Sequence, residues 1–196
     1  MKKNIIIFGA SRAGKTTLAK KLNEKLNFSV IGTDDITDIL RKSFPELMLN
    51  DSNDWEKTMA NFAPFIAHFI GTLDYRSKCF NGTNFIIEGW HYDFEKMLPI
   101  LKMYEIEELS DYFLLIGLVY PNKTPKEYFN DRKKYDSTDD WTYNLCDEEL
   151  KGLSIDAVEY NRKILDKYSI YNPRIYDVSQ EREQVLDKIV SDIASL

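Results

Sequence analysis

The sequence predicts an α/β fold in which helices cover both faces of a parallel β-sheet. Strand candidates alternate with helix candidates along the chain, a pattern typical of parallel strands joined by crossover helices. Two strand candidates contain uninterrupted apolar runs, Ile5–Ile7 and Leu114–Ile116, as expected for strands buried on both faces. A glycine-rich turn over 9–14 then joins the first strand candidate to the first helix candidate.

The strand candidates are short segments rich in apolar and β-branched residues. They lie at 4–8, 29–33, 84–88, 112–119 and 174–178. The tripeptide Asn81-Gly82-Thr83 is a turn signal directly before the third of them.

The helix candidates place apolar residues three and four positions apart. They cover 17–26, 36–42, 55–73, 126–135 and 147–168, and a last helix closes the chain. Pro64 is expected to kink or interrupt the third helix, because proline lacks the backbone N–H that a helix interior uses. Ser179 is a candidate N-cap for the last helix.

Two intervals between strands are too long for a single crossover helix. We therefore expect one domain, residues 1–196, with a helical insertion at about 44–82 and a second insertion with its following helix at about 121–172.

Composition excludes several classes of protein. The net charge of −6 makes nucleic-acid binding unlikely. No apolar run reaches the length of a membrane helix or resembles a signal peptide, so a cytoplasmic protein without a membrane partner is expected. Cys79 and Cys146 are far apart and are expected to be reduced thiols. The oligomeric state stays open.

The most specific motif is Gly9-Ala10-Ser11-Arg12-Ala13-Gly14-Lys15-Thr16, which matches the phosphate loop G-x-x-x-x-G-K-[ST]. Its backbone N–H groups and the following helix N-terminus are suited to an anion. Lys15 is expected to reach the β- and γ-phosphates of a nucleoside triphosphate, and Thr16 to ligate Mg²⁺. The motif and Thr17 therefore predict a site for ATP and Mg²⁺.

Carboxylates follow the second and third strand candidates. Asp34 and Asp35 come after the second, and Glu88 ends the third. Ligands gather at the carboxyl ends of parallel strands, where an acid can accept a proton from a hydroxyl or hold Mg²⁺. Asp34 can also simply cap the next helix, and Glu88 can simply end its strand in solvent. Which acid is the base and which holds the metal stays open.

Several further side chains are candidates for contact with ligands. Arg132 in the second insertion, or Arg162 after it, can neutralise charge on a transferred phosphate. Arg12 can lie over the nucleotide or in solvent. Gly89 is expected to allow close approach of a substrate to the backbone. His91 is expected to be a surface or structural histidine more often than an acceptor contact. Arg41, Arg76 and Trp55 are weaker candidates for the acceptor site.

This succession of strand, phosphate loop, acids and insertions resembles the phosphate-loop small-molecule kinases, which include adenylate, shikimate, gluconate and uridine kinases. The resemblance implies a three-layer, doubly wound, five-stranded parallel sheet with a helical acceptor-binding insertion and a mobile lid. It also implies that Asp34 faces the acceptor hydroxyl. Unlike adenylate kinase, the chain lacks an arginine pattern near the second strand and a lid motif with several close arginines.

The sequence therefore predicts an ATP-dependent phosphotransferase that moves the γ-phosphate of ATP to a hydroxyl or phosphate of an unidentified small molecule. Lys15, Asp34 and Arg132 are the expected catalytic residues, and Thr16, Asp34 and Glu88 the expected metal residues. The alternative is a P-loop ATPase or a nucleotide-binding regulatory protein without an acceptor. A GTPase is disfavoured because Pro125 replaces the acid of the guanine motif N-K-x-D and no D-x-x-G occurs.

Overall fold

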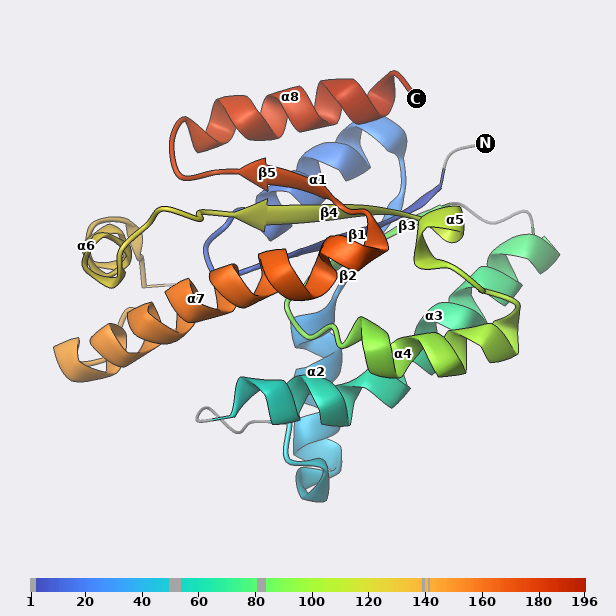
Figure 1. Ribbon diagram of the computed structural model, residues 1–196, viewed down its shortest axis with the longest axis horizontal. Helices are drawn as coiled ribbons and strands as arrows, with labels where there is room; N and C mark the ends of the chain where they lie inside the picture. The colour runs from blue at the N-terminus through green and yellow to red at the C-terminus, as the bar shows by residue number, and fades with distance from the viewer. Residues whose placement is uncertain (1–2, 50–53, 81–83, 139, 141) are drawn as a thin grey trace.

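A computed structural model of the chain describes residues 3–49, 54–80, 84–138, 140 and 142–196, with the backbone alone described for 76–80 (Figure 1). The expected turn at 81–83 and the side chains of Arg76 and Cys79 lie outside the described part.

All strands of the sheet run parallel, in the order β2-β3-β1-β4-β5. Their bounds are β1 Asn4–Gly9, β2 Ser29–Gly32, β3 Phe85–Gly89, β4 Phe113–Val119 and β5 Arg174–Asp177. The α/β fold class and the five strand predictions are confirmed, with ends that differ by a residue or so. β1 and β4 are the most apolar strands and lie at the centre, where both faces are covered.

Helices cover both faces of the sheet, as the doubly wound prediction requires (Figure 1). α1 (Lys15–Leu26) and α8 (Arg182–Ala194) pack together on one face, whereas α3 (Trp55–Phe80), α4 (Phe94–Leu101) and α7 (Asp147–Tyr168) lie on the other. The remaining helices are α2 (Thr33–Ser43), α5 (Leu109–Tyr112) and α6 (Pro125–Tyr135), with short 3₁₀ turns at 45–47, 102–104 and 169–171. α6 lies beyond the carboxyl end of β4.

Pro64 does not interrupt its helix, so that alternative of the prediction was wrong. α3 continues through Pro64 to Phe80. An interior proline costs about 3 kcal/mol, whereas full burial of one large apolar side chain contributes about 1.5–3 kcal/mol. Phe62, Ile66 and Ile70 of this helix are all fully buried, so packing outweighs the lost hydrogen bond.

Ser179 is not the N-cap of the last helix. Its N–H and hydroxyl both donate to Asp177 Oδ1, at 2.8 and 2.5 Å, and so close a turn after β5. Glu181 occupies the N-cap of α8 instead. Within the described ranges, no helix combines the length and apolar character needed to span a bilayer.

Candidate active site

A pocket of about 490 Å³ is formed by the phosphate loop (residues 9–16), β3, α2, α3, α7 and the segment around α6. It contains most of the side chains to which the sequence assigned chemistry. These are Arg12, Lys15, Thr16, Asp34, Glu88 and Arg132, together with the loop residues Ala10 and Ser11. Its position at the carboxyl ends of the strands is the usual place for a ligand in an open parallel sheet.

The phosphate loop depends on a close approach of the backbone to its neighbour. A Cβ atom on Gly9 would lie 2.2 Å from the carbonyl oxygen of Leu118 on β4, so only glycine fits. Gly14 and Arg12 have positive φ angles of 94° and 67°, conformations that glycine adopts easily and arginine rarely. Contacts of the Arg12 side chain, described below, stabilise this unusual backbone conformation.

Lys15 is buried at the first position of α1, where its Nζ donates to the carbonyl of Ala10 at 2.9 Å. Burial lowers the pKa of this ammonium group, and the nearby charges of Glu88 and Asp34 oppose that shift. A buried cation that uses one carbonyl acceptor is well placed to bind a phosphate oxygen.

Glu88 is brought to the loop by the register of the sheet. β3 pairs with β1 so that Glu88 lies opposite Ile7, and the Thr16 hydroxyl donates to Glu88 Oε1 at 2.9 Å. Burial raises the pKa of Glu88, while Lys15 and the Thr16 hydrogen bond oppose the increase. The alternative of a strand-ending glutamate in solvent does not describe this side chain.

Asp34 opens into the pocket from the first turn of α2. The helix has Gly32 at its N-cap with no side-chain cap, so the alternative that Asp34 serves only as a cap is not supported. The protein around Asp34 desolvates the carboxylate and raises its pKa, and the charge of Lys15 opposes this effect. The side chain itself stays largely accessible within the pocket.

His91 is a structural histidine beside Asp34. Its Nδ1 lies 2.9 Å from the Thr33 hydroxyl and 3.4 Å from Asp34 Oδ1, and its ring packs against Trp90 and Phe62. Burial, and then the charge of Lys15, lower the pKa of His91 to about 3, so the ring is neutral near neutral pH. Its neutrality lets it fix the start of α2 without adding charge.

Gly89 does not line the described pocket, and the structure gives another reason for a glycine at this position. A Cβ at this position would lie 1.7 Å from the Thr33 hydroxyl oxygen. The missing side chain therefore makes room for Thr33 at the start of α2.

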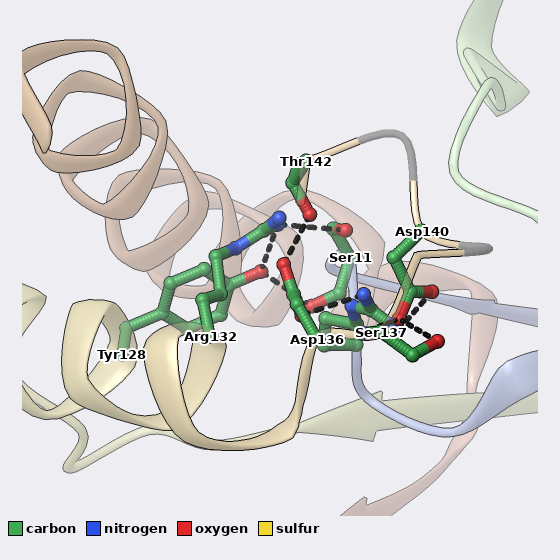
Figure 2. Close-up of polar contacts among 8 residues, drawn as sticks. Ser11, Tyr128, Arg132, Asp136, Ser137, Asp140 and Thr142 are labelled. Carbon is green, nitrogen blue, oxygen red and sulfur yellow. Dashed lines mark hydrogen bonds and ion pairs between the residues drawn. The ribbon is translucent and has the colours of Figure 1, made fainter. Parts of the chain in front are cut away.

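Arg132 joins α6 to the phosphate loop (Figure 2). It is almost fully buried, with Nη2 donating to Ser11 Oγ and to the Tyr128 hydroxyl, each at 2.9 Å. Its Nε and Nη1 atoms are buried without a hydrogen-bond partner in the described structure. Buried guanidinium donors without partners are costly, and an anion beside these two atoms would satisfy them.

Side chains after β4, on α6 and after α6 also contact the phosphate loop. The hydroxyls of Tyr120 and Tyr128 both donate to the Ser11 carbonyl, at 2.7 and 2.6 Å. Arg12 pairs with Asp136 at 2.6 Å and with Asp140 at 2.8 Å. The Arg12 hydrogen bond, followed by one from the Ser137 N–H, lowers the pKa of Asp140 to about 2. Arg12 therefore pairs with the segment that follows α6, while its side chain stays partly exposed.

Sequence reasoning missed one wall of the pocket. Leu153, Asp156, Ala157 and Tyr160 of α7 line it with Trp90, beside Trp55, which the sequence had named as a weaker candidate for the acceptor site. The apolar spacing of the α7 residues predicts a helix over 147–168 but not a pocket wall, because periodicity alone does not separate a core from a pocket.

Three weaker candidates do not line the pocket. Arg162 is exposed on α7, Arg41 pairs with Asp38 on its own helix, and Asp35 turns back toward Gly32. In the described structure only Arg12, Lys15 and Arg132 supply positive charge to the pocket lining.

The residues present fit ATP and Mg²⁺. No group of three or more His, Cys, Asp or Glu in the described chain forms a metal cage. Mg²⁺ bound with a nucleotide needs few protein ligands, because phosphates and water supply the others. Thr16 and Glu88 would hold it, while Lys15 and the unpartnered nitrogens of Arg132 match phosphate oxygens.

Parallel strand order, phosphate loop and the covering insertions together define the fold of the P-loop small-molecule kinases. The chain is similar to the crystal structure of shikimate kinase from Bacteroides thetaiotaomicron, with 17% identity, a TM-score of 0.55, and coverage of 98% of this chain and 97% of that one. It is also similar to shikimate kinase from Acinetobacter baumannii in complex with shikimate, with 15% identity, a TM-score of 0.55, and coverage of 100% and 94%.

A gluconokinase from Sinorhizobium meliloti 1021 matches with 12% identity, a TM-score of 0.53, and coverage of 98% of this chain and 92% of that one. These likenesses confirm the fold that the resemblance implied. Neither a protein-family model nor a curated protein matches the sequence.

Proposed function

We propose that this protein is an ATP-dependent phosphotransferase that moves the γ-phosphate of ATP to a hydroxyl group of a small molecule. The observation that carries the proposal is the single pocket that joins Lys15, the Thr16–Glu88 pair, Asp34 and the unpartnered guanidinium of Arg132. Phosphoryl transfer needs positioning and charge stabilisation above all, and this set of side chains supplies both.

Each residue has one proposed role. Lys15 binds phosphate oxygens, Thr16 and Glu88 hold the metal directly or through its water, and Asp34 accepts the proton of the acceptor hydroxyl. Arg132 stabilises the charge on the transferred group. When bound, ATP and Mg²⁺ supply the phosphoryl group and neutralise part of its charge.

The competing proposal is a P-loop ATPase or a regulatory nucleotide-binding protein. The test is calorimetry with MgATP, followed by ADP release measured with and without a library of small hydroxyl compounds. A kinase binds MgATP and releases ADP mainly when an acceptor is added. ADP release that is indifferent to every acceptor indicates an ATPase, and absence of MgATP binding at millimolar concentration would contradict both.

Asp34→Asn is expected to lower turnover by roughly 10²–10⁴-fold, the usual contribution of a positioned acid–base group. The same change should raise the melting temperature of the unliganded protein near neutral pH. The raised pKa means that the folded state disfavours the ionised carboxylate, so Asp34 costs stability as pH rises through its unfolded value, and asparagine removes that cost.

Asp38→Asn is the matched control on the same helix. Asp38 is paired with Arg41 and Lys42, and hydrogen bonds, with Lys42 first, lower the pKa of its carboxylate. The control should therefore leave turnover unchanged and shift the melting temperature slightly in the opposite direction. Full activity in Asp34→Asn would exclude it as the base and leave Glu88 or Asp35.

We propose that α6 and the residues at its end form a lid over the phosphates. Asp136→Asn is expected to increase hydrogen exchange in α6, because it removes the charge that pairs the end of α6 with Arg12 of the phosphate loop. MgATP should restore protection by closing the segment over the phosphates. Exchange measured by mass spectrometry, with Asp131→Asn on the exposed side of α6 as the control, checks this. Equal exchange in the two variants would show that the Arg12 contact does not hold the lid.

A further inference from the structure

The wall of the pocket formed by α3, α7 and the residue after β3 differs chemically from the phosphate side. It consists of the aromatic rings of Trp55, Trp90 and Tyr160, with Leu153, Ala157 and the carboxylate of Asp156 beside them. The acids and cations of the phosphate side already have proposed roles, so this wall is the part that remains to contact the body of an acceptor.

The three rings are held in a fixed arrangement. Tyr160 meets Trp55 edge to face at 5.0 Å between centroids and Trp90 at 6.1 Å, and its hydroxyl donates to the Trp90 carbonyl at 2.7 Å. The faces and edges of such rings bind planar or apolar groups, and their faces attract cations. Within the protein itself, the ammonium group of Lys163 already contacts the Trp55 ring, with Nζ 4.9 Å from the ring centroid.

The charge that lines the pocket on this wall is negative, since Lys163 contacts the Trp55 ring without lining the pocket. The cations that line the described pocket are Arg12, Lys15 and Arg132, and all of them belong to the phosphate loop or to α6. Asp156 has no hydrogen-bond or ion-pair partner among the described residues. Burial and the nearby charge of Glu159 raise the pKa of its carboxyl group, as happens where no cation faces an acid.

We propose that the acceptor is an alcohol that carries a protonated amine on an aromatic or apolar body. The inference rests on the proposed function. The ammonium group would face Asp156 and the aromatic rings, and the hydroxyl would face Asp34. A carboxylate such as shikimate, which the Acinetobacter baumannii enzyme binds, would meet Asp156 here, and no cation lines this wall of the described pocket.

The chemistry balances without a further reactant. The hydroxyl loses its proton to Asp34, and its oxygen forms a bond to the γ-phosphorus of ATP. The bond between that phosphorus and the β–γ bridging oxygen breaks, and ADP leaves with the electron pair. The amine takes no part in the transfer and serves only in recognition.

Three probes with one skeleton and different charge test the proposal: 2-amino-1-phenylethanol, 1-phenyl-1,2-ethanediol and mandelate. Their binding to the MgADP complex is measured by calorimetry, with tryptophan fluorescence as a second readout. We expect the amine to bind at least about tenfold more tightly than mandelate, with the diol between them.

Asp156→Asn should reduce the preference for the amine over the diol by about fivefold or more, and Asp156→Lys should reverse the order of amine and mandelate. Asp166→Asn is the matched control, because Asp166 is exposed on the same helix and does not line the pocket. It should leave both MgADP binding and the probe preference unchanged.

The outcomes separate the two proposals. Absence of nucleotide binding overturns the proposed function. Normal nucleotide binding with equal or tighter binding of mandelate overturns the acceptor inference alone. Failure of the amine to bind at about 10 mM, or a preference that survives in Asp156→Lys, likewise overturns the inference and leaves the kinase proposal intact.

Discussion

Replacing Lys15 by methionine is expected to abolish measurable phosphoryl transfer and the stabilisation of the protein by MgATP. The buried ammonium is the phosphate-loop cation nearest to Glu88 and Asp34, and methionine keeps its length without its charge. A ligand at 100 times its Kd stabilises a fold by about 2.7 kcal/mol, which for a chain of this size raises the melting temperature by roughly 5–10 °C.

Thermal unfolding with and without MgATP measures this effect. Lys20→Met on the exposed side of α1 is the control, since it makes the same chemical change away from the pocket. The wild type and the control should show the increase, whereas Lys15→Met should show none. A normal MgATP shift in Lys15→Met would remove Lys15 from the phosphate site.

Arg132→Ala is expected to lower turnover by about 10³-fold or more, the range measured when an arginine that stabilises transferred charge is removed. The affinity for MgADP should change far less, because the proposed contact strengthens only as charge moves during transfer. Arg132→Lys should recover only part of the activity, since lysine keeps the charge but not the forked geometry of the donors.

Lys134→Ala on α6 controls for loss of a cation from that helix, because its side chain stacks on Tyr135 and does not line the pocket. A structural role for Arg132 is distinguished by its signature. In that case Arg132→Ala lowers the melting temperature and the MgADP affinity together with turnover, and Arg132→Lys restores stability and turnover together. Turnover within a few fold of wild type in Arg132→Ala would refute the proposal that Arg132 stabilises the charge on the transferred group.

Much of the fold could be predicted from the sequence, because its strongest signals are local. The apolar cores of β1 and β4 and the Gly9–Thr16 motif each fix an element within a few residues. α4 was not predicted at all: it is short, contains Pro99, and starts at Asp93, whose side chain accepts from the Lys96 N–H. Its formation depends on packing against α3, a contact that no local pattern reveals.

The acids of the candidate site could be predicted because backbone topology determines where they lie. Asp34 and Glu88 follow strands whose carboxyl ends meet, so their shared pocket follows from a parallel sheet. The partners of Arg12 lie more than 120 positions away, at Asp136 and Asp140, and no spacing rule connects them. The α7 wall carries the same periodicity as a core helix, so only the tertiary structure separates these two readings.

The position of β3 between β2 and β1 also has a consequence for how the chain folds. In the described sheet β2 pairs with β3, which follows it only after the 26-residue α3. The phosphate loop and Asp34 therefore leave the ribosome several seconds before Glu88, at synthesis rates of ~5–20 residues per second. Until β3 is inserted, β2 has no neighbouring strand in the described sheet, and the Thr16 hydroxyl lacks the Glu88 carboxylate as its hydrogen-bond acceptor. Nucleotide binding during refolding should thus lag behind helix formation and report when this long-range strand insertion is complete.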